Sequence, residues 1–179
     1  MGRTGDARID LRVAAVDEHV RQENRHDLDA LLATFGADAY YEDAPWGERH
    51  DGIAAVREYY ARLFRAAPDL HVEVKRRHIA ADAIVLEVLI TGTQLGTWRG
   101  LPATRRRLEF PLCAIYTFDQ NDRMLGERIY YDRATVLRQL GVMSEPMSLG
   151  GRLGMLLLHP ATLVRAGMRS ALRRAKSPK

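Results

Sequence analysis

The segment ERIYYD (127–132) brings a carboxyl group, phenols and a guanidinium together at the end of a predicted strand. Asp132 stands where this strand would run into a short helix, so it could cap the helix or act as an acid or base in a pocket. Because side chains alternate along a strand, Asp132 shares one face with Tyr130 and Arg128. A carboxyl beside a phenol and a guanidinium suits proton transfer next to a stabilised oxyanion.

The opposite face of the same strand carries Glu127, Ile129 and Tyr131. Either face therefore has polar groups that a simple apolar core would avoid. A β-bulge would exchange the two faces, which keeps Tyr131 a candidate.

Other candidate site residues lie on or beside predicted strands. Glu42 ends a short aromatic strand and Trp46 follows closely, either at the mouth of a pocket or in a solvated loop. Glu87 interrupts the apolar run IVLEVLI, so it is either paired, for example with an arginine of a neighbouring strand, or faces a pocket. Trp46 and Trp98 are walls of a pocket or ordinary packing residues.

Several classes of function are disfavoured by the sequence. It contains no Walker-type loop, no GxGxxG, no GxSxG and no Cys/His metal pattern. Its single cysteine, Cys113, cannot form an intramolecular disulfide and fits a reducing cytoplasm. The charged opening MGRTGDARID predicts that no secretory signal is present, and we expect a cytoplasmic protein.

The predicted elements that must position these residues are mostly helices first and strands afterwards. Helices are predicted over 7–25, 28–35, 53–66 and 133–140, and strands over 39–43, 71–79, 83–92, 107–119 and 124–132. Asp51 is predicted to cap the third helix, Gly141 to end the fourth, and Pro111 to mark a bulge or an edge. This order predicts an α+β fold with helices on one face of a mostly antiparallel, curved sheet and a pocket between them.

The C-terminal segment differs in charge from the rest. Residues 144–179 hold seven basic residues and one acidic residue, a net charge of +6, whereas residues 1–143 carry −2. An apolar helix, a break at His159-Pro160 and a second helix are predicted there. The segment could pack on the domain, join two copies or adsorb to an acidic membrane surface. Nucleic-acid binding is disfavoured because no reading module accompanies the charge.

Three segments carry a resemblance to a known family. They are FRAAPDLHVEV (64–74), TGTQLGTWRGLPATRRRLEFP (91–111) and ERIYYDRATVLRQLGV (127–142). In order and spacing they resemble the SnoaL-like polyketide cyclases of the nuclear transport factor 2-like, or ketosteroid-isomerase-like, superfamily. The resemblance covers about residues 14–142 and implies a cone-shaped α+β barrel in which a curved sheet wraps a long helix. We assign residues 7–143 to this domain. Residues 144–179 would be a basic helical extension.

The resemblance also implies an activity and a site. A pocket carboxylate, aligned with Asp132, would shuttle a proton for the intramolecular aldol closure of a polyketide ring, without metal or organic cofactor. Tyr130 or Tyr131 would polarise a carbonyl and Gln94 would orient the substrate, although Gln94 stands where members commonly have histidine. The expected substrate-binding residues are Tyr131, Trp46, Trp98, Glu42, Glu87, Tyr60, Tyr116 and Arg128.

Two other interpretations of the protein's function remain open beside that of an enzyme. The favoured interpretation is acid/base catalysis on an apolar, oxygenated small molecule of secondary metabolism by a homodimer or larger oligomer. A non-catalytic small-molecule-binding or dimeric interaction module of the same fold is the alternative. A third interpretation makes the basic tail central, as a weak contact with a membrane surface.

Overall fold

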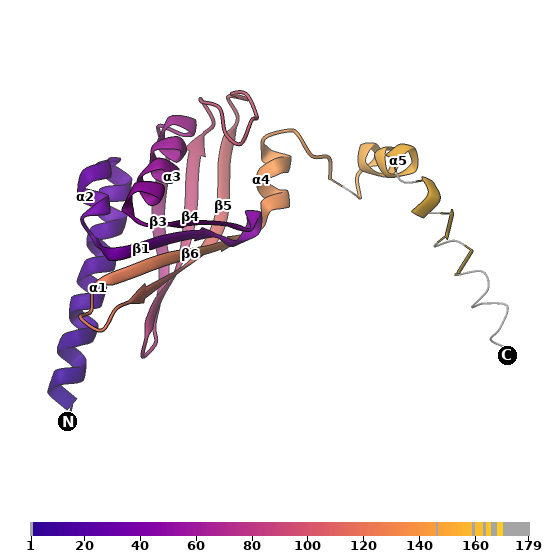
Figure 1. The fold of residues 1–179 in the computed structure, drawn as a ribbon. Helices are drawn as coiled ribbons and strands as arrows, with labels where there is room; N and C mark the ends of the chain where they lie inside the picture. The colour runs from indigo at the N-terminus through magenta and orange to yellow at the C-terminus, as the bar shows by residue number, and fades with distance from the viewer. Residues whose placement is uncertain (1, 146, 159, 163, 166–167, 170–179) are drawn as a thin grey trace, which may run out of the picture. The chain divides into compact units, whose positions relative to one another are not determined.

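The strands of this protein form a strongly curved sheet, and helices cover its concave face. The computed structural model describes residues 2–145, 147–158, 160–162, 164–165 and 168–169. The chain divides into two units, residues 1–140 and 141–179, and each is described by itself. In Figure 1 strands β1 and β6 cross the direction of β3, β4 and β5, which gives the sheet its curvature.

The helices are α1 (Gly2–Arg25), α2 (Leu28–Leu32), α3 (Ile53–Ala66), α4 (Arg133–Gln139) and α5 (Leu149–Leu158), with a 3-10 turn η1 at Ala44–Trp46. The strands are β1 (Phe35–Asp43), β2 (Glu48–Asp51), β3 (His71–Ile79), β4 (Ala83–Thr93), β5 (Arg107–Phe118) and β6 (Met124–Tyr131). Helix α3 and strand β3 have the predicted bounds.

The strands described here pair in one sheet in the order β2-β1-β6-β5-β4-β3. Neighbouring strands are antiparallel except β1 and β6, which run parallel, with Tyr41 opposite Glu127. Helix α1 packs against β3, β4 and β6, and α3 packs against β1 and β2. This arrangement confirms the predicted α+β fold, a curved sheet wrapped around helices.

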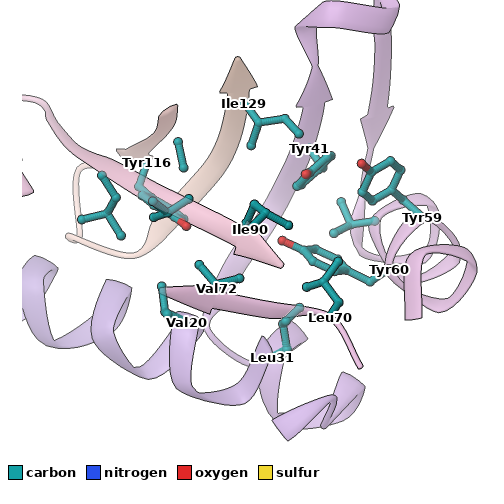
Figure 2. Close-up of a cluster of buried hydrophobic side chains, with 14 of the residues drawn as sticks. Val20, Leu31, Tyr41, Tyr59, Tyr60, Leu70, Val72, Ile90, Tyr116 and Ile129 are labelled. Atoms are coloured by element: carbon teal, nitrogen blue, oxygen red, sulfur yellow. The ribbon is translucent and has the colours of Figure 1, made fainter. Parts of the chain in front are cut away.

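The core lies between the sheet and the helices, and strand β4 shows this most clearly because its side chains alternate strictly. Every second side chain of β4 is buried, among them Leu86 and Val88, while its other side chains face outward. Tyr60 of α3 and Tyr116 of β5 are fully enclosed, and Figure 2 shows their side chains directed toward the interior of the buried cluster. Each large apolar side chain buried there contributes roughly 1.5–3 kcal/mol.

The structure corrects the prediction in three places. Residues 48–51, for which no strand was predicted, form the short edge strand β2, with His50 opposite Tyr41 of β1. The second helix ends at Leu32 instead of residue 35, and β1 begins at Phe35. Helix α3 has Gly52 at its N-cap with no side-chain bond, so Asp51 does not cap it. A four-residue edge strand without an apolar pattern leaves little signal in a sequence.

Two predicted boundaries are confirmed. Gly141 follows α4 with a φ of 75°, the left-handed conformation that ends helices. The pairing of β5 with β6 ends at Leu112, which lies opposite Tyr131. Pro111 comes just beyond that last pair, so on this side of β5 it lies at a local edge of the sheet. Nearby, the N–H of Glu109 donates to Oε1 of Gln139 (3.0 Å), and Nε2 of Gln139 donates to the Glu109 carbonyl (2.7 Å). The α4 side chain therefore covers this edge.

The second unit contains α5, whose first turn is capped by the Ser148 hydroxyl accepting from the N–H of Gly151 at 3.0 Å. Much of the second tail helix predicted after Pro160 lies outside the described residues. None of the helices in the described part of the chain is long and apolar enough to cross a membrane.

Candidate functional site

A pocket opens between the concave face of the sheet and the helices. Its cavity volume is about 100 Å³, well beyond the ~10–15 Å³ that one water molecule needs. Apolar side chains of α3, β4, β5 and α4 form most of the wall, including Leu63, Ile90, Leu112, Val136 and Leu140. The carboxyl groups of Glu23 and Glu127 and the phenols of Tyr41, Tyr59, Tyr116 and Tyr131 interrupt this wall.

Glu127 of β6 is the centre of a buried group of polar side chains, which we call the deep cluster (His19, Glu23, Tyr60, Tyr116 and Glu127). The hydroxyl of Tyr60 donates to Oε2 of Glu127 at 2.7 Å. The same oxygen lies 3.4 Å from Nε2 of His19. All these side chains are buried, and His19 and Tyr60 are fully closed to solvent.

The hydrogen bonds of Thr34 determine how the His19 ring is held. The Thr34 hydroxyl donates to the Leu31 carbonyl at 2.6 Å, so it is left to accept from Nδ1 of His19 at 2.9 Å. Nδ1 therefore carries a proton, and Nε2 is the nitrogen that can take up or release one. Since Nε2 faces Glu127 and Tyr60, the exchangeable proton lies on the pocket side of the ring.

Glu23 is the second carboxyl of the deep cluster, one helical turn after His19 on α1. It is 8% exposed and lines the pocket, and its carboxyl group accepts no hydrogen bond from any residue that the structure describes. Burial raises the pKa of Glu23 well above its ordinary value, and the nearby charge of Glu127 raises it further. Glu23 therefore favours its protonated form, whereas the Glu127 carboxylate accepts a hydrogen bond from Tyr60.

The phenols around the pocket remain protonated hydrogen-bond donors. Burial raises the pKa values of Tyr41, Tyr59, Tyr60 and Tyr116 well above the ordinary value for tyrosine. The charge of Glu127 adds to this effect for Tyr60 and Tyr116. In Figure 2 the hydroxyl groups of Tyr60 and Tyr116 point into the buried cluster.

A third buried carboxyl group, that of Asp43, lies behind the pocket wall. Its Oδ2 accepts from Nη2 of Arg99 (2.7 Å) and from the hydroxyls of Tyr59 (3.3 Å) and Tyr131 (3.4 Å). Tyr131 in turn accepts from Nε1 of Trp46 at 2.7 Å. Burial raises the pKa of Asp43, and the charge and hydrogen bond of Arg99 oppose that effect. Asp43 therefore holds two pocket tyrosines and an arginine in place.

Asp132 does not lie in the pocket, contrary to our expectation. It is the N-cap of α4, where its carboxylate accepts from the N–H of Ala134 (2.9 Å) and the hydroxyl of Thr135 (2.6 Å). Its side chain is 60% exposed and pairs with Arg138 at 3.3 Å. The Thr135 hydrogen bond, followed by backbone N–H groups and Arg138, lowers the pKa of Asp132. Capping accounts for this residue.

The face of β6 that we assigned to the pocket is the outer one. Tyr130 is 44% exposed, and Nη2 of Arg128 forms an ion pair with Glu42 of β1 at 2.8 Å. These three residues therefore lie on the convex side of the sheet, away from the pocket. Glu87 also faces outward and pairs with His78 (2.8 Å) and Arg76 (3.8 Å) of β3, which confirms the paired alternative.

Gln94 lines the pocket, but its amide is fully used in holding a loop together. Its Oε1 accepts from the N–H (3.0 Å) and hydroxyl (2.6 Å) of Thr104, and its Nε2 donates to the carbonyls of Gly96 and Pro102. It is 2% exposed. No amide group remains to orient a substrate, so this arrangement corrects the expected role of Gln94.

The remaining predicted binding residues divide between the wall and its support. Tyr131, Trp98 and Tyr116 line the pocket. Tyr60 lies next to it through its bond to Glu127, and Trp46 supports the wall through Tyr131.

Two deep-cluster residues, His19 and Glu23, were missed in the sequence. The available signal was their position on the apolar stripe of α1, since Val16, His19, Val20 and Glu23 follow the spacing i, i+3, i+4, i+7. Polar residues on such a stripe are buried and need a partner or a function. Within the described residues, no group of three or more His, Cys, Asp or Glu side chains could hold a metal ion.

The comparisons with known proteins agree with this architecture. The family model described as SnoaL-like polyketide cyclase matches residues 12–140. Among solved structures, AclR from Streptomyces galilaeus is 22% identical, with a TM-score of 0.66 over 76% of this chain and 99% of that chain.

Two other structures are similar at the level of the fold. A ketosteroid isomerase-like protein from Catenulispora acidiphila, solved with trimethylamine, is 21% identical, with a TM-score of 0.61 over 72% of this chain and 93% of its own. SalBIII, an epoxide hydrolase/cyclase-like enzyme of pyran ring formation in the polyether salinomycin, is 22% identical, with a TM-score of 0.58 over 68% and 91%. At these identities the likeness establishes the fold alone.

Proposed function

The chain belongs to the SnoaL-like polyketide cyclase family, and on that premise we propose that its pocket performs general acid/base chemistry on an apolar, oxygen-bearing small molecule. The observation that carries the proposal is a pair of buried carboxyl groups in one apolar pocket. The Glu127 carboxylate is hydrogen-bonded and faces a histidine, whereas the Glu23 carboxyl group has no hydrogen bond to a described residue and has a raised pKa. Two carboxyl groups in such different surroundings can take opposite roles, one as base and one as acid.

The reaction we propose is proton abstraction next to a carbonyl group. Glu127, with His19 behind it, removes a proton from the carbon beside the carbonyl, and the enolate that forms attacks a second carbonyl of the same molecule. The new carbon–carbon bond leaves an alkoxide, which takes a proton from the Glu23 carboxylic acid. The proton on the Glu127–His19 pair then returns to Glu23, so the site is restored without net proton loss.

The tyrosines supply hydrogen bonds where negative charge develops. Tyr41 and Tyr116 line the pocket, and their raised pKa values keep them protonated as donors. Donors that face an enolate oxygen inside an apolar wall act more strongly than they would in water. The apolar lining also matches a carbon-rich ring or chain in preference to a charged metabolite.

Hydrogen–deuterium exchange tests the first step without knowledge of the natural substrate. The probe is 2-decalone, an apolar bicyclic ketone, and NMR follows deuterium uptake beside its carbonyl in heavy water. We expect the protein to accelerate this exchange and Glu127→Gln to lower the acceleration by about 10²–10⁴-fold. The control Glu87→Gln changes an exposed, outward-facing glutamate and should leave the exchange unchanged.

Two outcomes would contradict the proposal. If 2-decalone binds with no acceleration of exchange, the non-catalytic binding module becomes the better description. If Glu127→Gln exchanges the probe as fast as the unmodified protein, Glu127 is not the base.

A further inference from the structure

The described part of the second unit presents an unusually apolar helix surface. Four leucines of α5, which we call the leucine stripe, are 58–86% exposed: Leu149, Leu153, Leu156 and Leu157. Their spacing of i, i+4, i+7 and i+8 places them on one face of the helix. Leu158 lies on the opposite face, as the helical period of 3.6 residues requires.

Basic residues surround this stripe in the sequence. Arg152, Arg165 and Arg169 are exposed, and none forms an ion pair with another described residue. The sequence adds Arg173, Arg174, Lys176 and Lys179, and residues 144–179 carry a net charge of +6. An apolar stripe next to concentrated positive charge matches a surface that is apolar inside and negatively charged outside.

This combination favours a lipid surface over a second copy of the chain. A symmetric contact between two tails would bring two charges of +6 together, which repel each other. Anionic lipid head groups neutralise that charge while their acyl chains receive the leucines. Because α5 has only ten residues, it can lie along a bilayer surface but cannot span the bilayer.

We propose that residues 144–179 bind this protein to the surface of an anionic bilayer through the leucine stripe and the arginines that follow it. The inference is independent of the pocket chemistry, because binding to vesicles is measured without turnover. An apolar ligand dissolved in the same bilayer would then be concentrated near the protein.

Co-sedimentation of the full chain with vesicles tests the proposal. One set of vesicles contains phosphatidylglycerol and phosphatidylcholine in equal parts, and the other contains phosphatidylcholine alone. We expect binding to the first set, little binding to the second, and weakening as salt is added. Leu153→Glu should abolish most of the binding, whereas Leu158→Glu, which changes the charge equally on the opposite face, should weaken it far less.

A charge-matched pair of variants tests the arginines. Arg165→Gln with Arg169→Gln should lower affinity for anionic vesicles by roughly tenfold or more. Arg76→Gln with Arg107→Gln removes the same charge from exposed positions of the sheet and should have little effect. Equal loss in the two pairs would reduce the effect to net charge and overturn the proposal. An absence of binding to anionic vesicles would also overturn it. So would the finding that Leu153→Glu changes only self-association, measured by sedimentation velocity, and leaves vesicle binding unchanged.

Discussion

Nε2 of His19 lies 3.4 Å from Oε2 of Glu127, and both side chains are buried. The pair joins the first helix of the domain to its last strand. Thr34 holds the far side of the ring, so any proton that the imidazole exchanges is directed toward Glu127. The orientation of the ring therefore depends on a threonine that does not line the pocket.

Replacing Thr34 with valine should release the His19 ring. Valine has the same shape but cannot accept from Nδ1, so the Nδ1–H tautomer loses its fixed partner. We expect ¹⁵N NMR of the imidazole to show a mixture of tautomers, and 2-decalone exchange to fall by about tenfold, a fraction of the effect of a full acid/base group. Thr117→Val removes a hydroxyl that bonds Tyr40 instead and should leave the imidazole spectrum unchanged. An unaltered His19 spectrum in Thr34→Val would contradict the prediction.

Glu23 should destabilise the fold as pH rises. Below its ordinary pKa of 4.5 the carboxyl is protonated in the folded and unfolded states and has no effect. Above that value the unfolded chain loses the proton while the folded state retains it, so the free energy of unfolding falls until the pH reaches the raised folded pKa. Each pKa unit of elevation corresponds to about 1.4 kcal/mol.

The glutamine variant makes this effect measurable. Glu23→Gln should be more stable than the unmodified protein near neutral pH, and the difference should shrink to nothing below about pH 4. Urea denaturation across a pH series measures it, with Glu87→Gln as the exposed control. A gain in stability that does not vary with pH would rule out titration of Glu23 as the cause.

Asp132→Ala should separate capping from catalysis. The variant loses the bonds to Ala134 and Thr135, so Tm should fall near neutral pH. Since the folded pKa of Asp132 is lowered, its stabilisation is present above the unfolded value and is lost as pH falls through the folded one. The Tm difference should therefore become smaller in acid. Thermal melts and 2-decalone exchange are measured side by side, and a large loss of exchange would return Asp132 to the reaction.

Asp43→Asn should leave the largely buried Arg99 guanidinium with Glu48 as its remaining carboxylate partner. Breaking a buried pair outright costs about 3 kcal/mol or more, so we expect a smaller loss here, which urea denaturation measures. The double variant Asp43→Asn with Arg99→Met removes both charges and should recover part of that loss. The single variant Arg99→Met completes the comparison. If the double variant loses as much stability as the two single variants together, the two side chains do not interact energetically.

The sequence was informative wherever an apolar pattern was strong. The apolar stripe of α3 and the β-branched, apolar run of β4 predicted both elements, although that run suggested a strand covered on both faces and the structure buries only one face of β4. It was much less informative about which polar face of β6 turns inward, because Tyr130 and Tyr131 are chemically equivalent and both faces carry charged groups. The structure settles the choice through β1, whose buried residues Tyr41 and Asp43 share a face with Glu127 and Ile129.

The site could be predicted only in part, for a related reason. Glu127 was visible in the sequence, on the strand face that was not chosen for the candidate acid, and Asp132 was favoured because a strand-end acid aligned with the family's pocket residue. A cap and a catalytic acid have the same local sequence, since both follow a strand and precede a helix. The burial of His19 and Glu23 depends on strands far along the chain, which no local pattern contains.

The parallel pairing of β1 with β6 has a consequence for the order of folding. His19 and Glu127 stand near opposite ends of the domain in sequence, and they meet only after the last strand has docked beside the first. Contacts between such distant residues form late and slowly because the intervening loop must be closed. Proton exchange by this pair would therefore be among the last properties to return during refolding, and its recovery would report completion of the whole sheet.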